Sequence, residues 1–265
     1  MEKEMIGQDF VVGDEALLDA SSERGLLIDA AGFFAEDFGG NVYESPRVQV
    51  YMTVKDDTEI ELHYHEKADE IVYLYSGSGE IYKDGKWQSV EAGDLVITPK
   101  GMVHTLRSKK EETMKVIGFY TPAKGKIQDT VEVLDLNDVK KFGGDETIKV
   151  YHLGSFYQEH PLQPGEAATG ESVYKTERVE VVLGQNHGPL IHRHYHSVCE
   201  EIVYVYGGSG EMFIDGRWTK VKAGDFHINP RGVYHGARCI DGKDMQVLCL
   251  FTPPQPNGND KVFLD

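Results

Sequence analysis

Three histidines and one glutamate in the first half of the chain are the residues best suited to do chemistry. His63 and His65 are separated by one residue, Glu70 follows shortly after, and His104 lies beyond a proline and a glycine. On a β-strand, alternate side chains point to the same face, so the first two imidazoles would lie side by side. Three imidazoles and one carboxylate form a good ligand set for a divalent metal ion. The sequence therefore predicts a metal site at His63, His65, Glu70 and His104.

The same residues recur in the second half of the chain. When the sequence is shifted so that His63 falls on His194, 23 of the 42 positions from 63 to 104 are identical to those from 194 to 235, without a gap. Six of the 11 histidines fall at the matched ligand positions. A repeat of this length gives each copy enough chain for its own core. The repeat predicts a second metal site, formed by His194, His196, Glu201 and His235.

Each copy has the sequence features of antiparallel β-structure. Runs rich in β-branched and aromatic residues, at 71–75 and 202–206, are followed by glycines. Asp84-Gly85 and Asp215-Gly216 are typical of hairpin turns, because glycine adopts positive φ angles without steric cost. Short strands separated by regular turns favour a sandwich or a barrel.

The two ligand sets lie within motifs that resemble those of the cupin superfamily, G-x5-HxH-x3,4-E-x6-G and G-x5-P-x-G-x2-H-x3-N. Asp57 replaces the first glycine in copy one, and Ser108 and Cys239 replace the terminal asparagine. These positions are not metal ligands in the family, so the predicted sites are unaffected. The first motif is otherwise present as His63, His65, Glu70 and Gly77, and as Gly188, His194, His196, Glu201 and Gly208; the second is present as Gly93, Pro99, Gly101 and His104, and as Gly224, Pro230, Gly232 and His235.

The resemblance implies an all-β bicupin, in which two double-stranded β-helix (jelly-roll) barrels follow in tandem, each with one metal ion. We expect an N-terminal barrel with an N-terminal arm at residues 1–125, and a linker and C-terminal barrel at 126–265. A short helix is expected at 135–142, and residues 1–40 and 252–258 are expected to be flanking arms. In the family such barrels pack back to back or form dimers, so a homodimer is an expectation from the resemblance alone.

The composition argues against several classes of partner. The chain has 27 Lys+Arg and 44 Asp+Glu, a net charge of −17, which opposes binding to nucleic acid or to an anionic membrane surface. No apolar run approaches the roughly 20 residues that span a bilayer, and from the charged residues 1–5 we expect no signal peptide. Three cysteines without close pairing are expected to be reduced thiols in a cytoplasmic protein. At this net charge, neutral or cationic small molecules are favoured over anions.

The predicted metal ion would act as a Lewis acid, as a stabiliser of an enolate or as a redox centre. We expect two divalent ions per chain, and their identity stays open among Fe, Mn, Ni, Co, Cu and Zn, because ligand type ranks them only by general affinity. Bicupins with both ligand sets resemble quercetinase-like dioxygenases, oxalate decarboxylases and isomerases. The oxalate hypothesis is weakened, because those enzymes have an arginine where this chain has Ile60 and Ile191.

We therefore expect a metal-dependent enzyme that acts on a small enolisable or polyphenolic molecule. A dioxygenase is slightly favoured, because a site of three histidines and one glutamate with open positions accommodates both substrate and dioxygen. A redox-neutral isomerase, lyase or decarboxylase, in which the metal stabilises an enolate, is the second hypothesis. A non-catalytic binding protein is the third, and the two complete ligand sets argue against it.

Four residues are candidates for proton transfer. Glu70 or Glu201 would move a proton while loosely bound to the metal. Glu61 and His192 each lie two residues before the first histidine of a ligand set, so strand alternation would place them inside their barrels. Either side chain can serve as a general base near neutral pH. Because these two residues differ, the two sites are not expected to be chemically equivalent.

Overall fold

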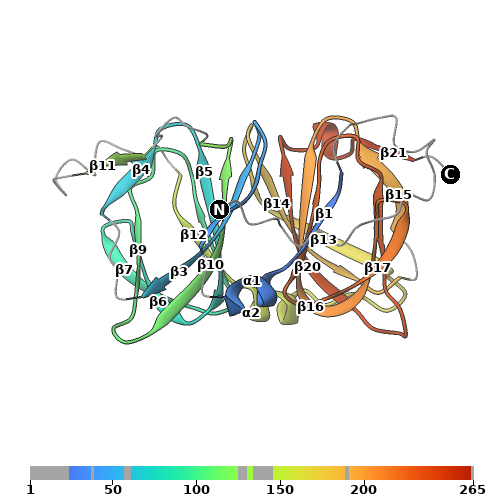
Figure 1. Ribbon diagram of the computed structural model, residues 1–265, viewed down its shortest axis with the longest axis horizontal. Coiled ribbons are helices and arrows are strands. Elements are labelled where there is room, and N and C mark those ends of the chain that lie inside the picture. The colour runs from blue at the N-terminus through green and yellow to red at the C-terminus, as the bar shows by residue number, and fades with distance from the viewer. Residues whose placement is uncertain are drawn as a thin grey trace. The chain divides into compact units, whose positions relative to one another are not determined.

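The chain folds mainly into β-strands, as a computed structural model shows for residues 24–36, 39–56, 61–124, 130–133, 146–188 and 191–263. The strands form two compact units (Figure 1). The first barrel comprises Phe34–Glu159, and the second barrel combines the described residues through Phe33 with the chain from His160 onward. The predicted all-β fold of two barrels is therefore confirmed.

The described residues of the first barrel form strands and one helix as follows: β2 (Gly40–Glu44), β3 (Gln49–Asp56), β4 (His63–His65), β5 (Asp69–Ser76), β6 (Ser78–Lys83), β7 (Lys86–Glu91), β8 (Asp94–Thr98), β9 (Thr105–Ser108), β10 (Thr113–Thr121), β11 (Thr130–Glu132), β12 (Lys149–His152) and α2 (Leu153–Glu159). Its larger sheet has the order β12-β8-β5-β10-β3-β2, and β7-β6-β9 and β11-β4 form smaller sheets.

The second barrel repeats this arrangement. Its strands are β1 (Leu26–Asp29), β13 (Ala168–Lys175), β14 (Glu180–Asn186), β15 (Ile191–His196), β16 (Glu200–Ile214), β17 (Arg217–Lys222), β18 (Asp225–Asn229), β19 (His235–Arg238), β20 (Met245–Thr252) and β21 (Lys261–Phe263), with a 3-10 turn η3 (Pro256–Gly258). Strand β16 pairs with β18 and β20, just as β5 pairs with β8 and β10.

Two hairpin turns lie where the sequence predicts them. Asp84 and Gly85 join β6 to β7 with φ angles of 50° and 78°. Asp215 and Gly216 make the equivalent turn between β16 and β17, with φ angles of 45° and 83°. Positive φ at both central residues matches the right-handed twist of the flanking strands.

The inner face of each barrel is apolar next to the predicted ligands. Along β5, Glu70, Val72 and Leu74 alternate and so share this face. The two apolar residues belong to a buried cluster, and the second barrel has an equivalent cluster on β16 and its neighbours. The members are Val72, Leu74, Ile81, Val90, Val96, Leu106, Met114, Val116 and Ile148 in the first barrel, and Val205, Met212, Ile214, Val221, Cys239, Met245 and Val247 in the second.

Each barrel takes one edge strand from a segment that precedes the other barrel. Strand β1 pairs with β18, with Leu26 opposite Ile228. Strand β12 pairs with β8, with Lys149 opposite Ile97. The two partners, Ile97 and Ile228, occupy the same place in the repeat. A free strand edge exposes unpaired backbone groups, and each borrowed strand satisfies them.

This exchange changes the expected domain organisation. The chain does not divide into contiguous units at residue 125, because the described N-terminal residues through Phe33 belong with the second barrel. The expectation that residues 1–40 form a flanking arm is wrong for β1, which is a strand of the second barrel's sheet. Segment 252–258 leads into β21, which pairs with β15.

The helices are short. Helix α1 spans Ala30–Ala35, and α2 spans Leu153–Glu159. The helix expected at 135–142 lies outside the described residues. Within the part of the chain that is described, no helix is long and apolar enough to cross a membrane.

The exchanged strand can be tested by truncation. Deleting residues 1–29 removes β1, so amide hydrogen exchange in β18 is expected to become faster. Exchange in β8 should stay unchanged, because its partner β12 remains. Mass spectrometry of peptides from both strands measures this difference. Equal protection of β18 in the full-length and truncated chains would contradict the pairing.

Candidate metal centres

The four predicted ligands of the first barrel come together in the structure. His63 and His65 lie on β4, Glu70 is the second residue of β5, and His104 directly precedes β9. The backbone of His63 exchanges two hydrogen bonds with that of His104, which brings the two imidazoles together. Candidate ligand atoms of all four residues lie within 4.8 Å of one another, and all four residues are buried. The set can hold one metal ion.

Backbone carbonyls fix the orientation of two imidazoles. His63 Nδ1 donates to the carbonyl oxygen of Glu61 at 2.7 Å, and His104 Nδ1 donates to that of Met102 at 2.9 Å. In a neutral ring held this way, Nε2 is the unprotonated atom, the one that can bind a metal. His104 Nε2 lies 2.7 Å from Glu70 Oε2, and His65 Nε2 lies 3.4 Å from the same oxygen. The imidazole nitrogens therefore converge on one carboxylate oxygen.

The electrostatics of this cluster give the protonation states that a metal requires. Burial lowers the pKa of His63 to about 4 and also lowers the pKa of His65. Burial alone would raise the pKa of Glu70, but its contacts with His104 and His65 hold it well below its usual value. At neutral pH the imidazoles of His63 and His65 are neutral and the carboxyl is ionised. These are the states in which His and Glu bind metals.

The second barrel assembles the equivalent four residues. His194 and His196 lie on β15, Glu201 on β16 and His235 on β19, all buried and with candidate ligand atoms within 4.8 Å of one another. His235 Nδ1 donates to the carbonyl oxygen of Val233 at 2.8 Å, and its Nε2 lies 2.8 Å from Glu201 Oε2. This repeats the geometry of His104 and Glu70.

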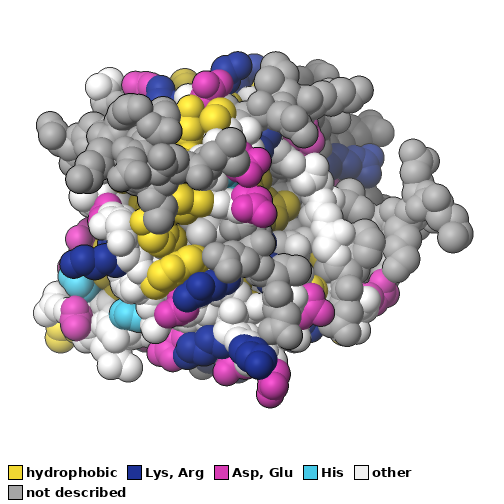
Figure 2. All heavy atoms as spheres, turned by 90° about the vertical axis from the view of Figure 1, so that its left-hand side faces the viewer, with side chains coloured by type: hydrophobic (Ala, Val, Ile, Leu, Met, Phe, Trp, Pro, Cys, Tyr) yellow, Lys and Arg dark blue, Asp and Glu magenta, His cyan; other side chains and the backbone are white. Residues whose placement is uncertain are grey.

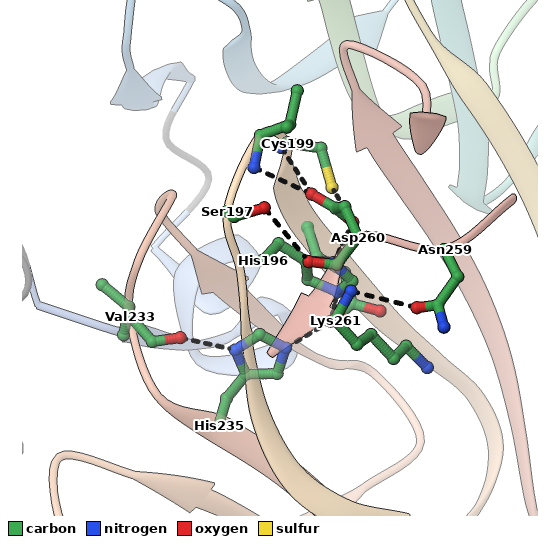
Figure 3. A network of polar contacts seen from close by, with 10 residues as sticks. His196, Ser197, Cys199, Val233, His235, Asn259, Asp260 and Lys261 are labelled. Carbon is green, nitrogen blue, oxygen red and sulfur yellow. Dashed lines mark hydrogen bonds and ion pairs between the residues drawn. The ribbon is translucent and has the colours of Figure 1, made fainter. Parts of the chain in front are cut away.

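Asp260 organises the second cluster from the C-terminal segment (Figure 3). Its Oδ1 accepts a hydrogen bond from His196 Nδ1 at 2.6 Å. Its Oδ2 accepts from the backbone N–H groups of Val198 and Cys199, at 2.9 and 3.1 Å. One buried carboxylate therefore orients a ligand imidazole and fixes the turn between His196 and Glu201. Partners of this kind raise the basicity of a ligand histidine and hold its ring in place.

The Asp260 carboxylate changes the electrostatics of the second cluster. Burial would lower the pKa of His196, but Glu201 and Asp260 raise it above its usual value. In the first barrel, His65 Nδ1 lies 3.4 Å from the Thr130 hydroxyl. Sequence reasoning missed Asp260, because it lies 64 residues from His196 and outside the repeat's most similar segment. Asp129, at the matching position of the first copy, was the available signal.

Buried ring nitrogens test whether these residues fit a metal ion. The Nε2 atoms of His65 and His196 are buried, make no hydrogen bond and lie 3.4 and 3.7 Å from the glutamate of their set. An unsatisfied buried polar atom costs about 1–3 kcal/mol, and a metal ion would remove that cost. Together with the ionised glutamates, these nitrogens fit a divalent transition metal.

Two tyrosines that sequence reasoning missed line the surroundings of Glu70. Tyr51, on β3, donates its hydroxyl hydrogen to Glu70 Oε1 at 2.6 Å. Tyr120, on β10, stacks on Tyr51 with ring centroids 4.9 Å apart and meets the His65 ring edge-on at 5.1 Å. Burial, followed by the charge of Glu70, raises the pKa of both phenols well above 10, so both stay protonated. The first metal site is therefore lined by proton-bearing groups.

The predicted proton-transfer residues have different outcomes. Glu70 and Glu201 lie in the two clusters. Glu61 is exposed and lies before β4, and its backbone carbonyl is the group that contacts His63. The backbone of His192 lies in β15, and its side chain lies outside the described structure. General-base roles for Glu61 and His192 stay predictions.

His227 is a buried histidine of the second barrel that is not part of the ligand set. It lies on β18, two residues from Asn229, which is directly opposite Glu201. Its ring centroid is 6.4 Å from that of His235, and its Nε2 is buried without a hydrogen bond. Burial lowers the pKa of His227 to about 3, so the ring is neutral at physiological pH. The first barrel has Val96 at this position.

Comparison with known proteins identifies the same two repeats. Residues 50–120 and 178–251 match the family described as "Cupin domain". A cupin 2 conserved barrel domain protein from Leptotrichia buccalis is similar, at 14% identity and a TM-score of 0.63, over 87% of this chain and 97% of that one. The similarity covers the greater part of both chains.

Two enzymes have similar structures. Salicylate 1,2-dioxygenase from Pseudoaminobacter salicylatoxidans, in complex with gentisate, is 13% identical, with a TM-score of 0.65 over 86% of this chain and 82% of that one. Oxalate decarboxylase from Bacillus subtilis is 16% identical, with a TM-score of 0.53 over 92% and 79%. At such low identity these similarities establish the fold.

Replacing Asp260 by asparagine removes the charge behind His196 while keeping its size. Metal affinity of the second site is expected to fall about 10- to 100-fold, because His196 becomes a weaker and less fixed ligand. Chelator competition measures this in a chain whose first site is removed by His63→Ala and His65→Ala. Asn259→Ala, which removes a neighbouring side chain that accepts from Lys261, is the matched control. Unchanged affinity in Asp260→Asn would contradict this role.

His227 is expected to make the metal-free protein sensitive to acid. The folded state keeps His227 neutral down to about pH 3, whereas the unfolded chain takes up a proton near pH 6.5. Stability is therefore lost as pH falls, by about 2 kcal/mol between pH 7 and pH 5. His227→Val, the residue of the first barrel, should reduce this loss by that amount in urea unfolding. An identical pH dependence in both proteins would contradict the assignment.

Proposed function

Because the chain belongs to the cupin family and buries two sets of three histidines and one glutamate, we propose that it is a metal-dependent enzyme that acts on a small enolisable or polyphenolic molecule. The observation that carries the proposal is the duplication of the complete ligand set, with matching Nδ1-to-carbonyl hydrogen bonds at His104 and His235. A protein that used its barrels only as a scaffold would have no need for eight buried ligands.

The chain's own residues would do three things at such a site. Backbone carbonyls hold the ligand imidazoles with Nε2 directed inward. Burial of all four ligands excludes water, which strengthens the electrostatic interactions at the centre. The Tyr51 hydroxyl holds a proton at Glu70 Oε1, where the carboxylate can share it with a reacting molecule. A bound metal would supply Lewis-acid or redox chemistry there.

A dioxygenase is the reaction class that we favour. An ion held by three imidazoles and one carboxylate would keep positions open for a substrate and dioxygen. The structural similarity to salicylate 1,2-dioxygenase is compatible with this class. Manganese is among the metals to test, because Bacillus subtilis oxalate decarboxylase is described with Mn(II) centres.

A redox-neutral isomerase, lyase or decarboxylase is the second candidate. The Tyr51–Glu70 hydrogen bond favours it, because proton transfer next to a carbonyl needs a protonated group and a carboxylate in contact. We also propose a cytoplasmic location, supported by three free cysteines. A homodimer remains a prediction from the family.

Metal content and oxygen uptake test the proposal. Untagged protein purified without added metal is expected to contain about two equivalents of a divalent transition metal by mass spectrometry, since each barrel has one set of three histidines and one glutamate. His65→Ala should lose one equivalent, and His65→Ala with His196→Ala should lose both. The metal-loaded protein is then screened for oxygen consumption with catechols, flavonols and enolisable ketones.

The outcomes separate the hypotheses. Oxygen-dependent turnover supports a dioxygenase, and equal turnover without oxygen supports the redox-neutral enzyme. Zinc as the sole bound metal also favours the redox-neutral class, because Zn²⁺ has no redox chemistry. Absence of bound metal after reconstitution with each candidate ion would contradict the proposal.

A further inference from the structure

The two metal sites differ at the residues that face the ligand glutamate. In the first barrel, Tyr51 contacts Glu70 Oε1 while Oε2 faces the imidazoles of His65 and His104. Oε1 therefore accepts the hydrogen bond from the phenol, whereas Oε2 is the oxygen that lies next to the imidazoles. A carboxylate oxygen that accepts a short phenol hydrogen bond has less electron density to give to a metal.

The second barrel has no phenol at either position. Val182 takes the place of Tyr51 in the repeat, and Phe251 takes that of Tyr120. The Phe251 ring lies edge-on to His196 at 5.4 Å, much as the Tyr120 ring lies edge-on to His65. The ring packing against the ligand histidine is thus repeated at the second position, and the second barrel lacks both phenol hydroxyl groups.

The backbone is adapted to this difference. Tyr51 lies opposite Gly118 on β10, where an added Cβ would come within 2.0 Å of the tyrosine Cζ. The second barrel has Cys249 at the equivalent place, opposite Val182. A large ring therefore pairs with a glycine in one barrel, and two medium side chains pair in the other. The phenol of the first barrel therefore depends on two residues together, Tyr51 and the glycine opposite it, Gly118.

We propose that the first barrel is the one whose metal ion binds an exchangeable anionic oxygen ligand, such as the enolate or carboxylate oxygen of a substrate. The inference rests on the proposed function and names the barrel and the ligand class. Tyr51 occupies Glu70 Oε1, so Glu70 would offer a bound metal one oxygen. Glu201 has no phenol partner at the equivalent position and would offer both oxygens, so the second site would have one open position fewer. Tyr51 acts here as a positioning residue, through Glu70.

The local surroundings of the first site are compatible with an anionic ligand despite the net charge of −17. Lys124 Nζ lies 3.6 Å above the Tyr120 ring and donates to the Thr130 hydroxyl at 3.1 Å. The second barrel has Gln255 at the position of Lys124. On the face of the first barrel in Figure 2, acidic and basic side chains are interspersed around hydrophobic ones. Lys124 therefore provides a positive charge beside the first site that the second barrel lacks at this position.

Azide binding to the Co²⁺-loaded protein tests the inference without a substrate. Two full-length proteins are compared: one keeps the first site, with His194→Ala and His196→Ala, and the other keeps the second, with His63→Ala and His65→Ala. Azide is expected to shift the Co²⁺ visible bands with an affinity at least about tenfold higher at the first site. Tyr51→Phe should lower that affinity to the level of the second site, and Tyr73→Phe on β5 should leave it unchanged.

A gain-of-function variant keeps the test decisive if Tyr51→Phe fails to fold. Val182→Tyr with Cys249→Gly introduces the phenol and its space into the second barrel, and azide affinity there should rise. Equal azide affinity at the two sites, or no change in either Tyr51→Phe or the introduced pair, would overturn this inference alone. Absence of Co²⁺ bands at both sites would instead overturn the proposed function, and this inference with it.

Discussion

Each barrel has to keep one carboxylate ionised inside an otherwise apolar interior. Burial works against the anion at Glu70 and Glu201, and the contacts with two imidazoles offset that cost. Backbone carbonyls orient the rings of His63, His104 and His235, so the polar centre is satisfied from several strands at once. The strand order, the turns and the apolar clusters are arranged so that these side chains meet at one point.

The sequence predicts the parts of this centre that depend on short spacings between residues, and these spacings recur in both copies of the repeat. His63 and His65 share a face because strand side chains alternate, and the internal repeat supports the choice of partners. Asp84-Gly85 predicts its hairpin because positive φ is a local property. The features that were missed depend on long-range pairing: Tyr51 lies 19 residues from Glu70, and Asp260 lies 64 residues from His196. Tertiary structure alone brings these side chains together.

Sequence identity between the repeats conceals a chemical difference. The ligands are the same, but Tyr51 and Tyr120 become Val182 and Phe251, and Val96 becomes His227. All of these positions lie on the inner faces of the barrels. A hydroxyl group or a ring nitrogen there affects the reactivity of a bound metal more than it affects the fold. Duplication therefore supplied two equal ligand sets, whose surroundings differ.

The exchange of edge strands has a consequence for how the chain is made. Strand β12 follows its partner β8 by about 50 residues, so this pair can form soon after it leaves the ribosome. Strand β1 is made before any other described strand, yet its partner β18 is among the last to be made. The nascent chain must carry this early segment unpaired through most of synthesis. The pairing of β1 with β18 is therefore one of the last strand pairings to form, and it joins the first described strand to the C-terminal part of the chain.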